Sequence, residues 1–213
     1  MQRRSSRQTA PMASSSTRRR ASRRSSQERR EAFLDAAVKA IRREGATVSM
    51  EVIAREAGVT KPIVYRLFGD RDGLLGALGE RMAAEVVTEV TAALDRVQGD
   101  DPKEMLHRAI AAYIALIDTE TEVYRFVTDR PGQGATLTGL SAEVARAIAV
   151  VLGEQLRANG ADSGAAEPWA FGLVGMVHLS GDWWVRTRTL PRDQLVTYLV
   201  DLLWNGFAAL TPE

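Results

Sequence analysis

The stretch from residue 49 to residue 71, SMEVIAREAGVTKPIVYRLFGDR, constrains the fold of this chain more than any other. It begins with four apolar residues at the i, i+3, i+4, i+7 spacing that places side chains on one helix face: Met50, Ile53, Ala54 and Ala57. Gly58 follows directly, where a helix end often needs a left-handed residue. Only three or four residues then separate this pattern from the next one. The stretch therefore predicts two short helices joined by a tight turn.

The second of these helices has two unlike faces. Val64 and Phe68 are four residues apart and point inward, whereas Lys61 and Tyr65 share the outer face. Thr60 is expected to cap the helix with its side-chain oxygen. A second helix with a polar, cationic outer face is the element that helix-turn-helix proteins place in the major groove of DNA. The alternative is an ordinary helical hairpin with solvated charges.

The residues around this hairpin resemble the N-terminal signature of the tetracycline-repressor (TetR) family of bacterial transcription regulators. The resemblance covers residues 27–71. It is carried by Gly45, Ser49, Ile53, Ala54, Ala57, Gly58, Val59, Thr60, Tyr65, Phe68 and Arg71. Two positions depart from the family pattern, with Ile63 where threonine is frequent and Leu67 where histidine or tyrosine is frequent.

The outer face of the second helix and the resemblance together imply a set of DNA contacts. Lys61, Tyr65 and Arg71 are expected to hold the phosphate backbone, and Ile63 and Arg66 to lie nearest the base edges. Ser49 is expected to cap the first helix and also to face a phosphate. The full predicted set is Ser49, Thr60, Lys61, Ile63, Tyr65, Arg66 and Arg71.

Charge is distributed unevenly along the chain, although the net charge is only +1. Residues 1–26 contain eight arginines and no acidic residue, and residues 27–71 contain nine basic and seven acidic residues. Residues 72–213 contain eleven basic and twenty acidic residues. Positive charge is therefore concentrated at the end that carries the helix-turn-helix, as a polyanion-binding surface requires.

Residues 1–26 are rich in arginine and serine and nearly free of large apolar residues. Such a segment cannot bury enough apolar surface to fold alone, so we expect a disordered arm. The arm either adds phosphate contacts or enters a minor groove, or it is a solvated tail. Its composition also resembles an organellar transit peptide, but it lacks the apolar face that would make it amphipathic.

Composition excludes several classes of function. Cysteine is absent and there are only two histidines, which argues against disulfides, thiol catalysis, cysteine-rich zinc sites and histidine metal sites. No apolar run approaches the roughly 18 residues of a membrane span. We expect a cytoplasmic protein that needs neither a cofactor nor a membrane.

Helical periodicity continues through the rest of the chain and predicts an all-α fold of about nine helices. A helix over residues 27–44, opened by Ser25 or Ser26 and closed by Gly45, would complete a three-helix DNA-binding domain. The remaining helices are expected at 72–98, 102–118, 121–128, 140–158, 166–188 and 191–209. The expected organisation is an arm (1–26), a helix-turn-helix domain (27–71) and an effector-binding and dimerisation domain (72–213).

The last predicted helix is apolar nearly all round, so it must be covered on both sides. A second copy of the chain is the simplest partner, and the resemblance implies that the last two helices form a four-helix bundle in a homodimer. For the adjacent pair Trp183 and Trp184, core packing is the alternative to an interface. The predicted dimer residues are Trp184, Leu199, Leu203, Trp204 and Phe207.

The middle of the C-terminal region offers apolar residues with a few polar tips, which is how ligand sites are usually lined. The predicted effector-binding set is Leu78, Met82, Tyr113, Ile117, Tyr124, Phe126, Ile148, Phe171, Val174 and His178. A solid core is the alternative, but the resemblance implies a cavity. Arg125 or Arg130 is expected to meet an acidic head group at its mouth. Three segments are similar to actinobacterial family members that respond to fatty acyl thioesters: residues 123–126, 173–176 and 183–184.

The function implied is a ligand-responsive transcriptional regulator, a repressor that binds palindromic operator DNA as a dimer and is switched by a small apolar effector. One alternative is an all-helical enzyme, against which stands the lack of any Ser/His/Asp arrangement, metal cluster or carboxylate pair in an apolar pocket. Another is an architectural DNA binder without a ligand, which would not need the long apolar C-terminal region.

Overall fold

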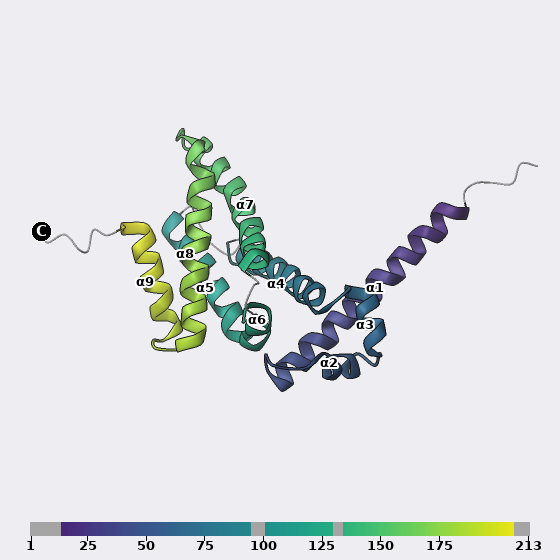
Figure 1. Cartoon of the computed structure of the whole chain (residues 1–213). Coiled ribbons are helices and arrows are strands. Elements are labelled where there is room, and N and C mark those ends of the chain that lie inside the picture. Colours follow the sequence, from purple (N-terminus) through teal and green to yellow (C-terminus); the bar gives the residue numbers. More distant parts are fainter. Residues whose placement is uncertain (1–13, 95–100, 130–133, 207–213) are drawn as a thin grey trace, which may run out of the picture.

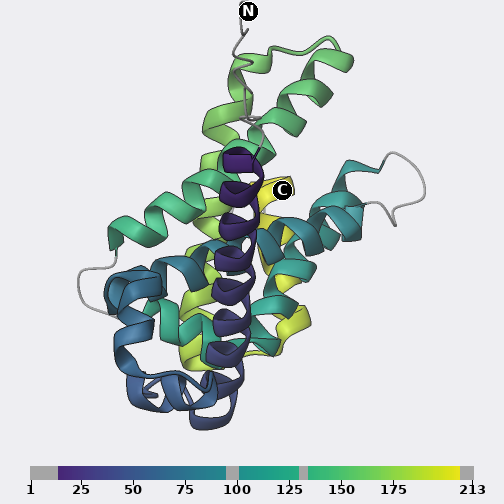
Figure 2. The ribbon, with the colours of Figure 1, turned by 90° about the vertical axis from the view of Figure 1, so that its right-hand side faces the viewer.

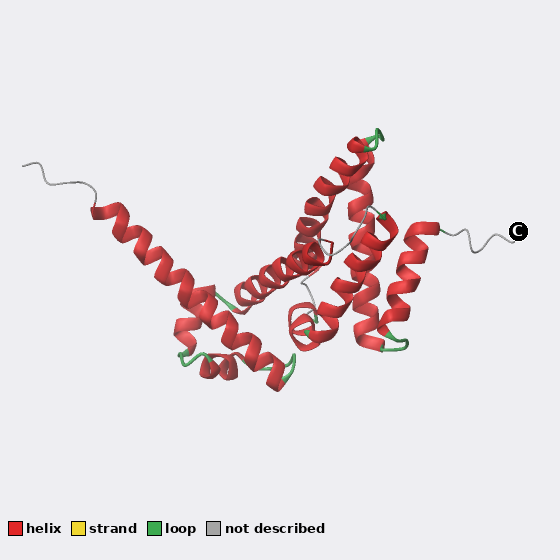
Figure 3. Cartoon of the chain, turned by 180° about the vertical axis from the view of Figure 1, so that it is seen from behind, coloured by secondary structure: helices red, strands yellow, loops and turns green. Residues whose placement is uncertain are grey.

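The computed structural model describes residues 14–94, 101–129 and 134–206. Within these ranges every element of regular secondary structure is a helix, and the helices are joined by short loops, as Figure 3 shows. The predicted all-α class with about nine helices is confirmed. The helices are α1 (Ser14–Glu44), α2 (Met50–Glu56), α3 (Lys61–Phe68), α4 (Arg71–Leu94), α5 (Pro102–Thr119), α6 (Thr121–Thr128), α7 (Gly134–Ala158), a short 3-10 helix η1 (Ser163–Ala165), α8 (Ala166–Thr187) and α9 (Arg192–Asn205).

The first three helices pack around one another through the apolar faces that the periodicity predicts. Phe33 of α1 lies against Phe68 of α3, with ring centroids 5.1 Å apart. Ile53 and Val64 are fully buried between them. Ser49 caps α2 as expected, because its Oγ accepts a hydrogen bond from the Val52 N–H at 3.4 Å. The helix-turn-helix is thus held by apolar packing between α1, α2 and α3, which is continuous with the core of the rest of the chain.

The turn between α2 and α3 corrects one prediction. Gly58 adopts the left-handed conformation (φ +65°) that ends α2. Thr60 occupies the cap of α3, but its side chain makes no capping hydrogen bond. A side-chain cap bonds the second or third N–H of a helix. Here the second residue is Pro62, which has no N–H, and the Ile63 N–H donates to the Thr60 carbonyl at 2.9 Å. The Thr60 hydroxyl is therefore not needed for capping.

The first helix is longer than expected. We predicted a start at Ser25 or Ser26, after a disordered arm, but α1 begins at Ser14 and projects beyond the body of the molecule (Figures 1 and 2). Extending an existing helix is far easier than nucleating one, and arginine is a good helix former. The pairs Arg24–Glu28 (3.2 Å) and Gln27–Glu31 (2.6 Å) stabilise this exposed part. The first half of the predicted arm lies outside the described residues.

The C-terminal domain is built from α4 to α9. The helix α4 packs against α5 and α7, α7 lies along α8, and α5 lies between α4, α8 and α9. The largest change among the predicted bounds is in α7, which begins at Gly134 instead of 140, whereas α4 begins at Arg71 instead of 72. The predicted ends of α4 near residue 98 and of α9 near residue 209 lie outside the described residues. None of the described helices has both the length and the apolar character needed to cross a membrane.

Candidate functional site

The outer face of α3 exposes the cationic and phenolic side chains that the sequence predicts there. Lys61, Tyr65 and Arg66 are all exposed, and Tyr65 retains 44% of its accessible surface although it is aromatic. Lys61 Nζ is paired with Glu51 of α2, which raises the pKa of the lysine and lowers that of the glutamate. A phosphate that binds Lys61 must therefore compete with Glu51.

Ile63 lies in a less exposed position than the other predicted contacts. It is half-buried and lines a groove of about 540 Å³ between α1 and α3. Arg66 lies on the same groove, and Arg29 contributes from α1. The groove therefore lies between α3 and the middle of α1.

Arg71 does not lie with the other predicted phosphate contacts. Its guanidinium lies over the ring of Phe126, 5.4 Å from the centroid, and Phe126 itself is buried. This contact joins the first residue of α4 to α6. Phe126 therefore faces Arg71 instead of the ligand cavity, whereas the phosphate contact expected of Arg71 stays a prediction.

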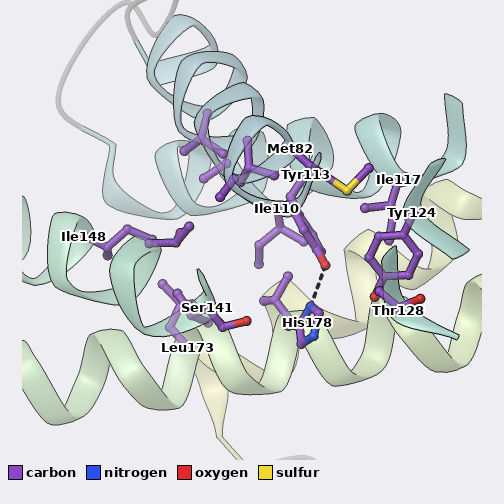
Figure 4. Close-up of a pocket in the computed structure, with 18 of the residues that line it drawn as sticks. Met82, Ile110, Tyr113, Ile117, Tyr124, Thr128, Ser141, Ile148, Leu173 and His178 are labelled. Atoms are coloured by element: carbon purple, nitrogen blue, oxygen red, sulfur yellow. Dashed lines mark hydrogen bonds between the residues drawn. The ribbon is translucent and has the colours of Figure 1, made fainter. Parts of the chain in front are cut away.

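The C-terminal domain encloses a cavity of about 130 Å³ between α4, α5, α6, α7 and α8 (Figure 4). Seven of the ten predicted effector residues line it, namely Met82, Tyr113, Ile117, Tyr124, Ile148, Val174 and His178. The lining residues that sequence reasoning missed are Gly79, Ala83, Val86, Val90, Leu106, Ala109, Ile110, Val127, Thr128, Ser141, Val144, Leu173 and Val177. Many of them are small, and these leave the space that larger neighbours surround.

Leu78, Phe126 and Phe171 do not line the cavity. Leu78 is fully buried and faces a separate polar pocket between α1, α4 and α6. Phe171 is 39% exposed. Successive residues of an α-helix are rotated by about 100°. Leu78 and Phe171 each lie roughly a quarter turn away from the residues of their own helix that face the cavity. The stripe on α4 follows Gly79, Ala83, Val86 and Val90, a spacing of threes and fours that is visible in the sequence once its phase is known.

Two hydrogen bonds order the polar side chains at one end of the cavity. Tyr113 Oη lies 3.0 Å from His178 Nδ1, and the Tyr124 hydroxyl donates to Asp182 Oδ1 at 3.3 Å. Burial raises the pKa of both tyrosines and lowers the pKa of His178. At neutral pH the three side chains are therefore uncharged.

A cluster of contacts joins the start of α6 to the helix-turn-helix domain. Arg42 of α1 forms two hydrogen bonds with the Glu120 carboxylate, of 2.9 and 2.5 Å, and these raise the pKa of the arginine. Glu122 Oε2 accepts the backbone N–H of Ala46 at 2.7 Å, in the loop between α1 and α2. We call Arg42, Ala46, Glu120 and Glu122 the interdomain latch.

The cations expected at the mouth of the cavity are not part of its described wall. Arg125 is exposed and pairs with Asp129 at 3.2 Å and with Glu122 at 3.8 Å. It lies on the outer face of α6, because Tyr124, Val127 and Thr128 occupy the inner one. Arg130 lies outside the described residues.

The predicted dimer residues fall into two groups. Trp184 and Leu199 belong to the core of the protomer, and the Trp184 Nε1–H donates to the Leu190 carbonyl at 2.8 Å. Arg188 covers the Trp184 ring at 4.1 Å. Leu203 is partly buried, Trp204 is 48% exposed, and Phe207 lies outside the described residues. Trp183, the other member of the tryptophan pair, is 45% exposed. Sequence reasoning missed several exposed apolar residues on α7, α8 and α9: Val150, Val151, Trp169, Leu179 and Tyr198.

A capped helix-turn-helix, joined by a long helix to a helical domain that contains a cavity, is the architecture of a DNA-binding regulator. The family model described as "Bacterial regulatory proteins, tetR family" matches residues 33–78. The model described as "Tetracyclin repressor-like, C-terminal domain" matches residues 89–212. The chain belongs to the TetR family of transcription regulators, as the sequence resemblance indicates, and it is not an enzyme.

Relatives and solved structures of this family match most of the chain. An uncharacterised HTH-type transcriptional regulator of Mycobacterium tuberculosis is 32% identical over 186 residues, which cover 86% of this chain and 79% of the relative. The HTH-type transcriptional activator FasR of Mycolicibacterium smegmatis is 27% identical over 185 residues, covering 85% and 84%.

Two solved structures share the fold. A TetR-like regulator from Rhodococcus sp. RHA1 is 25% identical with a TM-score of 0.58, covering 84% of this chain and 96% of that one. The regulator FadR of Bacillus subtilis, solved in complex with stearoyl-CoA, has a TM-score of 0.61 at 18% identity, covering 83% and 98%.

Proposed function

We propose that this TetR-family regulator is a homodimeric repressor whose affinity for palindromic operator DNA falls when a small apolar effector enters the cavity. One observation carries the proposal: two helices that line the cavity, α4 and α6, also contact the helix-turn-helix domain. A molecule that changes the packing of either helix changes the position of the DNA-binding surface.

The helix α4 is the direct connection. It begins at Arg71, directly after the recognition helix, and its first turns bury Leu74 and Leu75. Two turns further on, Met82 and Val86 face the cavity. An effector that displaces Met82 therefore acts on the same rigid element that orients α3.

The helix α6 is the second connection. Its inner face supplies Tyr124, Val127 and Thr128 to the cavity. The residues at its start form the hydrogen bonds of the interdomain latch with α1 and with the loop between α1 and α2. The effector shifts DNA affinity only by its differential affinity for two arrangements of these helices. By reciprocity, operator DNA changes the affinity for the effector by the same factor.

For DNA binding, we assign Lys61 and Tyr65 to the phosphate backbone. Arg66 is assigned to a base edge, and Ile63 to the floor of the DNA major groove. Thr60 and Ser49 lie at the N-termini of the two helices, where hydroxyl and N–H groups suit a phosphate. Arg71 is assigned to the domain junction because of its stacking on Phe126.

For dimerisation we place the interface on α8 and α9, which the exposed apolar residues support. Leu179 is 71% exposed, and Trp183, Tyr198 and Trp204 also keep much of their surface in the isolated protomer. Large apolar side chains left exposed in this number support an interaction site on these two helices. The partner is a second copy of the chain.

For the effector we propose an elongated apolar molecule, with fatty acyl thioesters as the first class to test. The walls of the cavity support an apolar ligand, and stearoyl-CoA in the B. subtilis FadR structure is the reason to begin with acyl thioesters.

The test is to titrate acyl-CoA thioesters, free fatty acids and aromatic drugs against the protein and its operator, following DNA release by fluorescence anisotropy. An effector at a hundred times its Kd should stabilise the protein by about 2.7 kcal/mol in thermal unfolding. Release of DNA by one class identifies the effector. Tighter DNA binding on addition of that class would reverse the sign of regulation, and the absence of any response would favour an architectural DNA binder.

A further inference from the structure

The effector cavity has two chemically different ends. Figure 4 shows Ile148 and Leu173 at one end and Tyr113, Tyr124, Thr128 and His178 gathered toward the other, where α6 closes the cavity. A ligand that fills the cavity therefore meets several hydroxyl groups and an imidazole at the α6 end, and mostly hydrocarbon, together with the Ser141 hydroxyl, toward α7.

Thr128 at this end has an unusual hydroxyl. Its Oγ1 is buried and has no hydrogen-bond partner among the described residues. Four other helical threonines instead donate to the carbonyl four residues earlier, at 2.8–3.0 Å: Thr88, Thr121, Thr187 and Thr197. Buried side-chain hydroxyls nearly always have a partner, and leaving one without is unfavourable. A polar group of a bound ligand would supply the partner that Thr128 lacks among the described residues.

The neighbouring hydroxyls are already satisfied. Tyr113 stays protonated because burial raises its pKa, and its Oη shares one hydrogen bond with Nδ1 of a neutral His178, whose donor depends on the histidine tautomer. When Nδ1 accepts, the other ring nitrogen of His178 is left as a donor, and when Nδ1 donates, the Tyr113 hydroxyl is left as a donor. Tyr124 donates to Asp182. The hydrogen-bonding capacity that is left for a ligand at this end therefore comes from Thr128 and from the Tyr113–His178 pair.

The charges around this end disfavour an anion. None of the described lining residues is an Asp, Glu, Lys or Arg. The carboxylate of Asp182 lies directly behind Tyr124, and its own cationic partner Arg186 is held in two hydrogen bonds of 2.9 and 3.1 Å. A carboxylate buried here would have no cation to pair with, which is strongly unfavourable.

We infer that the effector carries an uncharged hydrogen-bonding group, of the ester or thioester carbonyl type, which meets Thr128 at the α6 end while its hydrocarbon chain extends toward α7. The inference rests on the proposed function, since it names the chemical class of ligand for the same cavity. It excludes a free carboxylate from this end of the cavity, so the acidic head group expected beside Arg125 or Arg130 is not the group that meets Thr128.

Three probes of similar length separate the chemistry of the head group: methyl octanoate, octanoate and n-undecane, titrated into the full-length protein by calorimetry. We expect methyl octanoate to bind most tightly. The alkane should bind about 3- to 10-fold more weakly, because it leaves the Thr128 hydroxyl without a partner. Octanoate should bind more than roughly tenfold more weakly, because its charge is buried unpaired.

Variants assign the hydrogen bond to one side chain. Thr128→Val keeps the shape and removes the hydroxyl, so it should lower the affinity for methyl octanoate about 3- to 10-fold and leave n-undecane unchanged. Thr128→Ser keeps a hydroxyl and should restore most of the affinity. Thr88→Val is the matched control, because Thr88 is exposed on α4 and its hydroxyl bonds the Ala84 carbonyl at 2.8 Å.

The outcomes separate the inference from the function on which it rests. Octanoate binding as tightly as the ester would overturn the uncharged head group while leaving an apolar effector in place. An equal response of ester and alkane to Thr128→Val would remove Thr128 from the site. If none of the three probes binds or changes operator affinity, both the inference and the proposed function are wrong.

Discussion

The two domains of this regulator place their functional residues on opposite sides of their helices. In the helix-turn-helix domain the core is filled by Phe33, Ile53 and Phe68, and the DNA-facing residues lie on the outer surface. In the C-terminal domain the functional residues face inward, around a cavity of about 130 Å³. A surface site depends on the spacing of residues within one helix, whereas an internal site depends on how five helices leave space between them.

The largest expected effect is on the oligomeric state, and it comes from the exposed apolar residues of α8 and α9. Leu179→Asp should convert the dimer to monomers in sedimentation velocity, because an unpaired charge would be buried in the interface. Val87→Asp is the control, since Val87 is an exposed apolar residue on α4, away from α8 and α9. If Leu179→Asp and Trp183→Asp both remain dimeric, the interface lies elsewhere.

The contrast between a filled core and a hollow domain predicts unequal losses of stability. Ile53→Ala should lower the free energy of unfolding by about 2–5 kcal/mol, because Ile53 is fully buried in a solid core. Ile148→Ala should cost only about 1 kcal/mol, because Ile148 is half-buried beside existing space. Urea unfolding followed by circular dichroism measures both. Equal losses would mean that the cavity wall is packed as tightly as the core.

On the DNA-facing surface, Arg66→Ala should reduce discrimination between operator and altered operator by about 1–3 kcal/mol if the arginine pairs with guanine. Lys61→Ala should instead weaken binding to all sequences alike and lower the salt slope by about one. Anisotropy titrations with matched and mutated duplexes at several salt concentrations distinguish the two. Unchanged discrimination in Arg66→Ala removes that side chain from base readout.

The extension of α1 predicts an effect on affinity without specificity. Removing residues 1–24 deletes eight arginines. The dependence of log K on log salt should then flatten by about 0.9 for each phosphate that these arginines neutralise in the full-length protein. The ratio of operator to non-specific affinity should change little. An unaltered slope would show that residues 1–24 do not contact DNA.

The smallest expected change in stability comes from the interdomain latch, which links the two domains. Glu120→Gln should cost at most about 1 kcal/mol, because its partner Arg42 is largely exposed. It should nevertheless reduce the factor by which the effector changes DNA affinity, with binding of each ligand alone preserved. Glu56→Gln is the matched control, since Glu56 pairs with Arg43 at 2.7 Å within the DNA-binding domain. Equal coupling in both variants would exclude the latch from transmission.

The helix-turn-helix was predicted closely, because its determinants lie within a few residues of one another. The apolar stripe from Met50, the left-handed Gly58 and the Ser49 cap all follow from local spacing. Two departures from the predictions in this region have different causes, one local and one tertiary. Pro62 removes the N–H that a Thr60 cap would bond, and Arg71 lies on Phe126, which comes from a helix more than fifty residues away in the chain.

The residue types that line the cavity were predicted, but the side of each helix that faces it was not. Apolar residues with polar tips marked most of its wall, yet Leu78 and Phe171 have the right chemistry on the wrong side of their helices. Trp183 and Trp184 show the same limit, because neighbouring residues on a helix point about 100° apart, and one is exposed while the other is core.

By itself, the amino-acid sequence determined the all-helical class, the helix-turn-helix, its cationic face and the family, since these depend on periodicity, caps and composition along one segment. Only the tertiary structure decided which side chains enclose the cavity, that Thr128 lacks a hydrogen-bond partner among the described residues, and that Glu120 and Glu122 hold the DNA-binding domain. The physical reason is that space, burial and cross-domain hydrogen bonds depend on the rotation of each helix about its axis, which packing against its neighbours sets.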